Sequence, residues 1–359
     1  MNAPERFTLQ MSRFIRAPRD KVFAAFTTEA GLASWMGPRG MRVNAAQVHA
    51  EVGGAWQVEM QSRDGSLFVV GGRFTALHAP SGLAYTWQWK GEHNPMPGVE
   101  TLVEIALHEK DGGTEMHMTH SGFPAAAARD GHNQGWSSTF NRLSDALDPQ
   151  GSAGTVVLLG DVRSSYTRTA RMALAEKGVA YSLHACGPHT PDILAVHPFG
   201  KIPGLRDGDI AIWETEAIVN YIDECFGDAP TLRPGSIIER TRCLQWISSI
   251  NSYCYDTMVR RFVLQFVFPQ GEGGKPDTAV TDKALAEMAD QFKALEAAYG
   301  ERDFLAGASL SSADLFLAPI LAYVKSIPQG GALMARYANV TRAHDVIARR
   351  PSFTGTQPG

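Results

Sequence analysis

The chain has few cysteines, no long apolar run and no block of like charges. Its 359 residues include four cysteines, none before residue 186 and none in a C-x-x-C pair. A disulfide framework or a zinc site is therefore not expected. Every apolar run is shorter than the roughly 18 residues that a membrane helix needs. The net charge of −4 is spread evenly, which argues against nucleic-acid and anionic-membrane partners.

The beginning of the chain also lacks the pattern of a secretory signal peptide. Arg6, Arg13 and Arg16 interrupt its apolar residues. With the scarce cysteines, this favours a cytoplasmic protein in a reducing compartment.

Residues of the Pro, Gly and Ser types mark the expected domain boundaries. A chain of this length is expected to form two or three domains. Residues 148–154 predict a short flexible linker, and a second break at 232–236 precedes mainly helical patterns. We therefore predict domains over residues 1–149, 154–231 and 236–356.

The first domain is predicted to be an antiparallel sheet wrapped around a long helix. Residues 8–15 alternate like a strand, and a helix is expected to open at 17–20. Five more strands are predicted, over 53–60, 68–76, 83–89, 101–107 and 114–120. The last helix carries an apolar stripe of Trp136, Phe140, Leu143 and Leu147.

This order of elements resembles the START-like helix-grip superfamily, in the branch related to chaperone-activator domains. The resemblance is carried by residues 14–23, 35–38, 53–56, 120–124 and 135–136. It implies the fold, whereas the ligands of this superfamily vary widely. Five of the seven Trp and eight of the twelve Met lie in residues 1–150. They suit an apolar ligand cavity, or they simply fill the core.

A second set of motifs begins after the linker. Residues 155–160 predict a buried strand, after which Ser164, Ser165 and Tyr166 open an amphipathic helix. A hydroxyl at a helix N-terminus lies where backbone N–H groups favour an anion. The alternative is that a serine merely caps the helix.

Two further segments, residues 197–205 (HPFGKIPGL) and 212–222 (IWETEAIVNYI), complete this set. Together the three segments resemble the glutathione-binding half of the cytosolic glutathione transferases, which has a thioredoxin-like fold. Residues 236–356 resemble the family's all-helical domain. The resemblance implies a multidomain α+β protein: a START-like domain, then a thioredoxin-like α/β domain and an all-α domain. It also implies a homodimer that conjugates glutathione, as co-substrate, to a small hydrophobic electrophile.

The resemblance also implies roles for individual residues. Ser164 would donate a hydrogen bond to the thiolate of glutathione, with Ser165 or Tyr166 as substitutes. Glutathione would be bound by Ser165, Lys201, Ile202, Pro203, Glu214 and Thr215, with Pro203 in a cis peptide bond. His197 departs from the asparagine common at its position. Residues 161–170 contain no cysteine, which disfavours glutaredoxin-like exchange.

In the helical region, α-helical spacing puts Trp246, Ile250, Tyr253, Cys254 and Thr257 on one stripe. The family resemblance assigns Tyr166, Tyr253 and Thr257 to the electrophile pocket, although a bundle core is an alternative for this stripe. Ser311 and Asp314 predict a capping box of structural importance. No metal site is predicted.

Two other functions remain open on the sequence. One is a non-catalytic dimeric binding protein that uses the transferase fold as a scaffold. The other is a co-chaperone-like interaction module, for which the sequence offers no charged or disordered tail.

Overall fold

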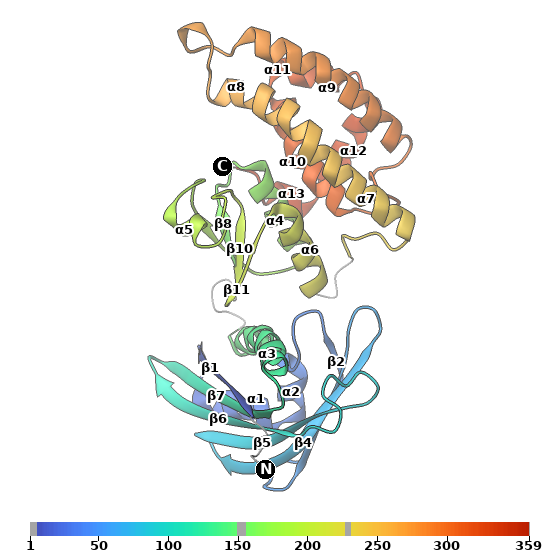
Figure 1. Cartoon of the computed structure of the whole chain (residues 1–359). Coiled ribbons are helices and arrows are strands. Elements are labelled where there is room, and N and C mark those ends of the chain that lie inside the picture. The colour runs from blue at the N-terminus through green and yellow to red at the C-terminus, as the bar shows by residue number, and fades with distance from the viewer. Residues whose placement is uncertain (1–5, 149–155, 227–230, 359) are drawn as a thin grey trace. The chain divides into compact units, whose positions relative to one another are not determined.

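The computed structural model describes residues 6–148, 156–226 and 231–358 (Figure 1). They group into two compact units, formed mainly by residues 1–157 and by residues 158–359. Of the predicted linker, all but Asp148 lies outside the described residues. Within the described ranges, no helix is long and apolar enough to cross a membrane.

The first unit is a seven-stranded antiparallel sheet in the order β1-β7-β6-β5-β4-β3-β2. Its strands are β1 (Phe7–Ile15), β2 (Arg42–Val48), β3 (Ala55–Gln61), β4 (Leu67–His78), β5 (Gly82–Lys90), β6 (Thr101–Lys110) and β7 (Gly113–Phe123). Its helices are α1 (Arg19–Thr27), α2 (Glu29–Trp35) and α3 (Ala126–Leu147). The predicted sheet and long final helix are confirmed, while β2 and α2 were not predicted.

The apolar stripe of α3 lies in the core of this unit. Trp136, Phe140 and Leu143 are buried, and the Trp136 ring centroid lies 4.9 Å from that of Trp87 on β5. Buried His120 accepts a hydrogen bond from Trp136 Nε1 at 3.0 Å. Burial is the main cause that lowers the pKa of His120 to about 3, so the ring is neutral. His120 is thus a core residue.

The second unit begins with a four-stranded sheet in the order β11-β10-β8-β9. Its strands are β8 (Val156–Gly160), β9 (Ser182–Ala185), β10 (Gly204–Asp207) and β11 (Ile210–Trp213). Its helices are α4 (Ser165–Glu176), α5 (Pro191–Leu194) and α6 (Thr215–Cys225). The C-terminal ends of α4 and α6 are joined by a buried ion pair, in which Lys177 Nζ lies 3.2 Å from Asp223 Oδ1.

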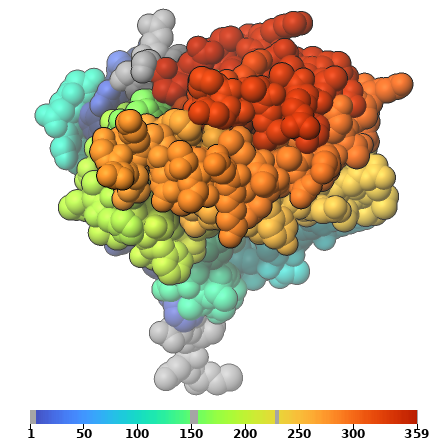
Figure 2. Space-filling view, turned by 90° about the horizontal axis from the view of Figure 1, so that it is seen from above, coloured from blue at the N-terminus to red at the C-terminus, as the bar shows by residue number. Residues whose placement is uncertain are grey.

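The rest of this unit is helical, and the helices from α9 onward form one continuous surface in Figure 2. The elements are α7 (Ile237–Ser249), η1 (Ile250–Val263), α8 (Leu264–Val267), η2 (Glu272–Gly274), α9 (Thr278–Tyr299), α10 (Ser312–Ser326), α11 (Pro328–Met334), α12 (Ala338–Ala348) and α13 (Pro351–Thr354). The predicted capping box of Ser311 and Asp314 is present at the start of α10 and is buried.

The element η1 is a π-helix that continues α7, so residues five apart lie next to each other. Asp256 Oδ2 pairs with Arg261 Nε at 2.8 Å, and the guanidinium of Arg260 lies 5.5 Å from the ring centroid of Tyr255. Of the predicted stripe, Ile250, Cys254 and Thr257 are buried, whereas the side chain of Tyr253 is exposed.

Candidate functional site

The turn between β8 and α4 presents Ser164 at the N-terminus of α4. A Cβ atom at Gly160 would lie 2.4 Å from Thr167 Oγ1, so glycine allows the helix to start this close to the strand. Ser164 Oγ accepts a hydrogen bond from the Thr167 N–H at 3.3 Å. This bond uses an oxygen lone pair and leaves the hydroxyl proton available. Helix capping and donation to an anion are therefore compatible roles for Ser164.

The neighbouring hydroxyl residues are placed differently. Ser165 is 5% exposed, in the first turn of α4. Tyr166 donates its hydroxyl proton to Asn251 Oδ1 at 2.8 Å, and its ring stacks on Tyr255 at a centroid distance of 4.5 Å. Burial is the main cause of the raised pKa of Tyr166, which keeps this hydroxyl protonated. Ser164 is half-buried, whereas Ser165 is buried and Tyr166 already donates its hydroxyl proton to Asn251. Of the three hydroxyl groups, that of Ser164 is therefore the best placed to donate to a ligand.

The turn before β10 contains a cis proline. The peptide bond between Ile202 and Pro203 is cis, which confirms the predicted conformation. Pro203 is buried, Ile202 is half-buried and Lys201 is exposed. The backbone of Ile202 therefore lies at the edge of the buried turn, next to the exposed side chain of Lys201.

Glu214 caps the N-terminus of α6 in an unusual backbone conformation. Its φ angle is +66°. Residues other than glycine rarely adopt such an angle, because it strains the backbone. Its carbonyl accepts the first helical hydrogen bond, from the Ile218 N–H at 2.9 Å. Thr215, which is buried, is the first helical residue. An exposed carboxylate, a hydroxyl and free helical N–H groups thus come together at one helix end.

His197 connects the cis-proline turn to Glu214. The imidazole is 2% exposed, and its Nδ1 accepts a hydrogen bond from the Phe199 N–H at 3.2 Å. The proton is therefore on Nε2, which lies 3.6 Å from Glu214 Oε1. Burial lowers the pKa of His197 and outweighs the opposing effect of Glu214. From the sequence, this position was recognised only as a departure from the family's asparagine.

The two residues predicted for the electrophile pocket in η1 differ in exposure. Tyr253 is 65% exposed. Thr257 is 2% exposed, and its Oγ1 accepts hydrogen bonds from Arg261 Nη2 and Gln291 Nε2, both at 2.9 Å. Asn251 and Tyr255 of η1 contact Tyr166. Sequence reasoning did not identify these two residues.

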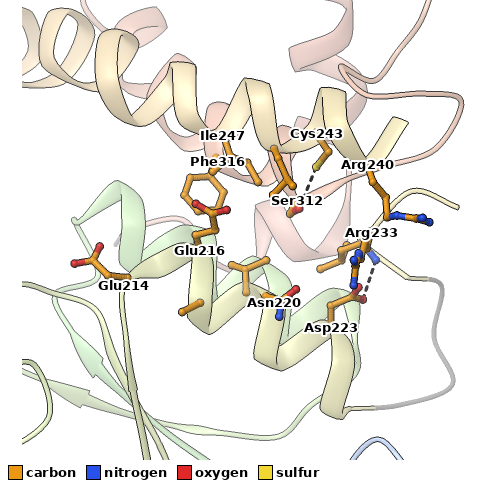
Figure 3. A pocket seen from close by; sticks show the side chains of 14 residues that line it. Glu214, Glu216, Asn220, Asp223, Arg233, Arg240, Cys243, Ile247, Ser312 and Phe316 are labelled. Atoms are coloured by element: carbon orange, nitrogen blue, oxygen red, sulfur yellow. Dashed lines mark hydrogen bonds between the residues drawn. The ribbon is translucent and has the colours of Figure 1, made fainter. Parts of the chain in front are cut away.

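A cavity of about 640 Å³ lies beside this site, between α6, α7 and the start of α10 (Figure 3). Glu214 lies at one end, and Arg233 and Arg240 lie at the other. Its apolar lining includes Val219, Ile247 and Phe316. The lining includes neither Ser164 nor Ile202, so the cavity touches the candidate site only at Glu214.

Among residues 6–148, 156–226 and 231–358, no group of three His, Cys, Asp or Glu side chains is arranged to hold a metal ion. The four cysteines are free.

Comparisons with known proteins find matching family models for three parts of the chain. Residues 16–148 match the family model of Activator of Hsp90 ATPase homolog 1-like protein. Residues 158–230 and 278–345 match the models of the glutathione S-transferase N-terminal and C-terminal domains.

Individual proteins are similar to the second unit. Glutathione S-transferase F10 of Arabidopsis thaliana is 32% identical over 164 residues, 44% of this chain and 76% of that protein. A stringent starvation protein A homolog of Coxiella burnetii is 27% identical over 158 residues, 44% of this chain and 69% of that protein. A structure of glutathione S-transferase-I bound with the ligand lactoylglutathione has a TM-score of 0.52 at 25% identity, covering 56% of this chain and 98% of that one. The chain therefore belongs to the glutathione S-transferase family and carries an additional START-like domain of the Activator of Hsp90 ATPase homolog 1-like type.

Proposed function

We propose that the protein conjugates glutathione to a hydrophobic electrophile, with Ser164 stabilising the thiolate. The observation that carries the proposal is the Ser164 hydroxyl at the N-terminus of α4, half-buried and with an available proton. The cis Pro203 turn and the strained Glu214 at the start of α6 support it. The lactoylglutathione bound to a similar structure agrees with a glutathione site in this fold.

The chemistry requires a thiolate, because the thiol form of glutathione is a poor nucleophile. A free thiol has a pKa of about 8.5 and is mostly protonated at neutral pH. A hydrogen bond from Ser164 to the sulfur, together with the N-terminus of α4, lowers that pKa. A charge-assisted bond of about 1.5–3 kcal/mol corresponds to one to two pKa units. The sulfur lone pair then forms a bond to the electrophilic carbon, and the leaving group departs with its electron pair.

The remaining residues bind the tripeptide. Ile202 would pair its backbone N–H and C=O with the cysteinyl part of glutathione. Glu214 would accept from the α-ammonium group, while Thr215 and the N–H groups of α6 would bind the γ-glutamyl carboxylate. The exposed ammonium of Lys201 would pair with the glycyl carboxylate.

Substitutions of the two serines in the full-length protein test this assignment. Ser164→Ala should lower turnover of a model aromatic electrophile by at least about tenfold while calorimetry still detects glutathione binding. Ser165→Ala, at the predicted binding residue next to it, should keep turnover at saturating glutathione within about threefold, even where it weakens glutathione binding. Thr215→Ala should weaken glutathione binding. If Ser164→Ala is fully active and Ser165→Ala or Tyr166→Phe is not, the thiolate role belongs to the neighbour.

We further propose that the START-like domain binds an apolar molecule with a hydrogen-bond acceptor. Much of the expected Trp and Met cluster fills the core, which limits the room for a ligand. On the inner side of β5, however, Tyr85 Oη and Trp87 Nε1 are buried without an acceptor among the described residues. Unpaired buried donors are costly and favour a bound acceptor, from water or from a ligand.

Native mass spectrometry of the freshly purified full-length protein, together with tryptophan fluorescence, tests the START-like site. A retained small molecule should be lost, and fluorescence quenching reduced, in Tyr85→Phe. If no molecule is retained and no apolar compound quenches the fluorescence, the donors bind only water. If the wild-type protein binds ligands but conjugates no electrophile, the non-catalytic scaffold is the correct function.

A further inference from the structure

We propose that helix α10 positions Ser164 for thiolate binding, with Tyr323 as the positioning residue. This inference rests on the proposed role of Ser164. Tyr323 lies on α10, and its hydroxyl donates a hydrogen bond of 2.6 Å to the carbonyl oxygen of Arg163. Tyr323 lies more than 150 residues away from Ser164 in the sequence.

The bond from Tyr323 fixes the peptide unit that carries the Ser164 N–H. The Arg163 carbonyl and the Ser164 N–H belong to one planar peptide group. Tyr323 holds the oxygen of this group, and the Asp161 carbonyl accepts its N–H at 3.0 Å. With both ends held, the plane cannot rotate, and the direction in which the Ser164 side chain leaves the backbone is fixed.

The Asp161 carboxylate makes the same turn more rigid. It accepts a hydrogen bond from the Arg163 N–H at 2.8 Å and another from Arg163 Nη2 at 2.7 Å. The hydrogen bonds with the Arg163 side chain are the main cause of the lowered pKa of Asp161. The carboxylate is therefore ionised at neutral pH and remains an acceptor for this turn.

Helix α10 holds α4 at a second point, one turn beyond Ser164. Pro319 has no N–H, so the carbonyl of Leu315 four residues earlier lacks its helical donor. Thr169 of α4 shares its hydroxyl proton between that carbonyl, at 3.0 Å, and the Ser165 carbonyl of its own helix, at 3.1 Å. The proline inside α10 thus provides an acceptor on which the catalytic helix is docked.

The start of α10 is itself firmly held. Asp314 accepts hydrogen bonds from the Leu305 N–H at 2.9 Å and from the Ser311 hydroxyl at 2.7 Å, in a fully buried position. Contacts on both sides of Ser164 therefore come from one anchored helix. Releasing the Tyr323 bond should let the turn relax and weaken the Ser164 bond to the thiolate, while the residues that bind the rest of glutathione stay in place.

The test compares Tyr323→Phe with Tyr337→Phe in the full-length protein. Tyr337 also donates its hydroxyl to a backbone carbonyl, that of Ala289 at 2.9 Å, which lies on α9 and not in the turn of Ser164. In Tyr323→Phe, the pKa of the bound glutathione thiol, read from the absorbance of the thiolate, should rise by about half to one unit. kcat/KM at neutral pH should fall by about three- to tenfold with KM for glutathione unchanged. Tyr337→Phe should leave the thiol pKa and kcat/KM as in the wild type.

Amide hydrogen exchange separates this inference from the proposed function. The peptide covering residues 161–168 should exchange faster in Tyr323→Phe and in Thr169→Val than in the wild type, and at the wild-type rate in Tyr337→Phe. Unchanged exchange in Tyr323→Phe overturns the positioning role, whatever the activity. Faster exchange with an unchanged thiol pKa shows that the bond only stabilises the fold and also overturns it. A wild-type protein that binds no glutathione refutes the proposed function instead.

Discussion

At the scale of single residues, His197 shows how one substitution relative to the family pattern is accommodated. Its Nδ1 caps the turn of Phe199, and its Nε2 faces Glu214. An asparagine could also accept the Phe199 N–H, although its shorter side chain would not fill the space of the buried ring. The histidine therefore accepts the Phe199 N–H as an asparagine could, and in addition it lies beside Glu214, whose backbone is strained.

Substitution of His197 should consequently separate these two effects. His197→Ala should lower the free energy of unfolding of the second unit by about 1–3 kcal/mol, because the Phe199 N–H loses its acceptor. It should also weaken glutathione binding. His197→Asn should recover most of the stability. Urea denaturation and calorimetry measure the two quantities, and an alanine variant that behaves like the wild type in both would contradict the role.

The buried Asp314 makes the stability depend on pH in an unusual direction. Burial is the main cause that raises its pKa to about 6, from 3.8 in an unfolded chain, against its hydrogen bonds. Between these values the folded state binds more protons than the unfolded state. The contribution of Asp314 to the free energy of unfolding therefore rises as the pH falls through about 6 towards 4, by up to about 3 kcal/mol.

Urea denaturation of the wild type and Asp314→Asn between about pH 4.5 and 7 measures this contribution. The stability of the wild type relative to the variant should increase towards acid pH. Asp345 is the matched control, because its hydrogen bond with Lys325 lowers its pKa, so its contribution is lost on acidification. A stability difference between wild type and Asp314→Asn that shrinks as the pH is lowered would contradict the assignment.

At the scale of elements, the π-helix η1 contacts the first turn of α4 through Tyr255. Tyr255 stacks on Tyr166, whereas Tyr253 is exposed. Tyr255→Ala should raise KM for a hydrophobic electrophile by about three- to tenfold, because aromatic contact area is lost. Tyr253→Ala should leave it unchanged. Steady-state kinetics with the electrophile varied at saturating glutathione distinguishes the two, and equal effects would refute this placement.

Most elements could be predicted from local patterns. The strands of the first unit alternate between core and solvent, and the predicted long helix matches α3. The strand β2 escaped prediction because its polar and small residues, such as Asn44 and Gln47, mask the alternation. The helix α2 spans only 7 residues and gives little periodic signal. The π-helix could not be predicted, because the change from α to π spacing depends on the contacts of η1 with neighbouring helices.

At the scale of the whole molecule, the two units should fold separately. The first unit has its own core of buried residues from all its strands but β2, and from its three helices. We expect the fragments 1–148 and 154–359 each to be soluble and to unfold cooperatively by calorimetry. The assignment of the boundary to residues 148–154 is wrong if both fragments unfold or aggregate when separated there.

The second unit should form a homodimer. Several large apolar side chains are exposed on the turn before β10 and on α7: Phe199, Ile237, Ile238 and Leu244. Light scattering should give twice the chain mass for 154–359, and Leu244→Glu should shift it towards the monomer. Val267→Glu, at a similarly exposed apolar residue on α8, is the control and should remain dimeric. A monomeric 154–359 at micromolar concentration would overturn the arrangement.

The sequence by itself determined the two kinds of fold, the transferase family and the segments from which the site is proposed. These features depend on short-range patterns: alternation in strands, a hydroxyl before a helix, a proline in a turn and a capping box. They can be predicted because neighbouring residues in the chain are also neighbours in space.

Only the tertiary structure decided which side chains meet. It left the Ser164 hydroxyl proton available while Tyr166 is bound to Asn251, and it placed His197 beside Glu214. It also brought Tyr323 to the Arg163 carbonyl. Each of these contacts joins separate elements of the chain, and its formation depends on how those elements pack against each other. No local pattern encodes that geometry, since a change in register by one residue turns a different side chain towards the site.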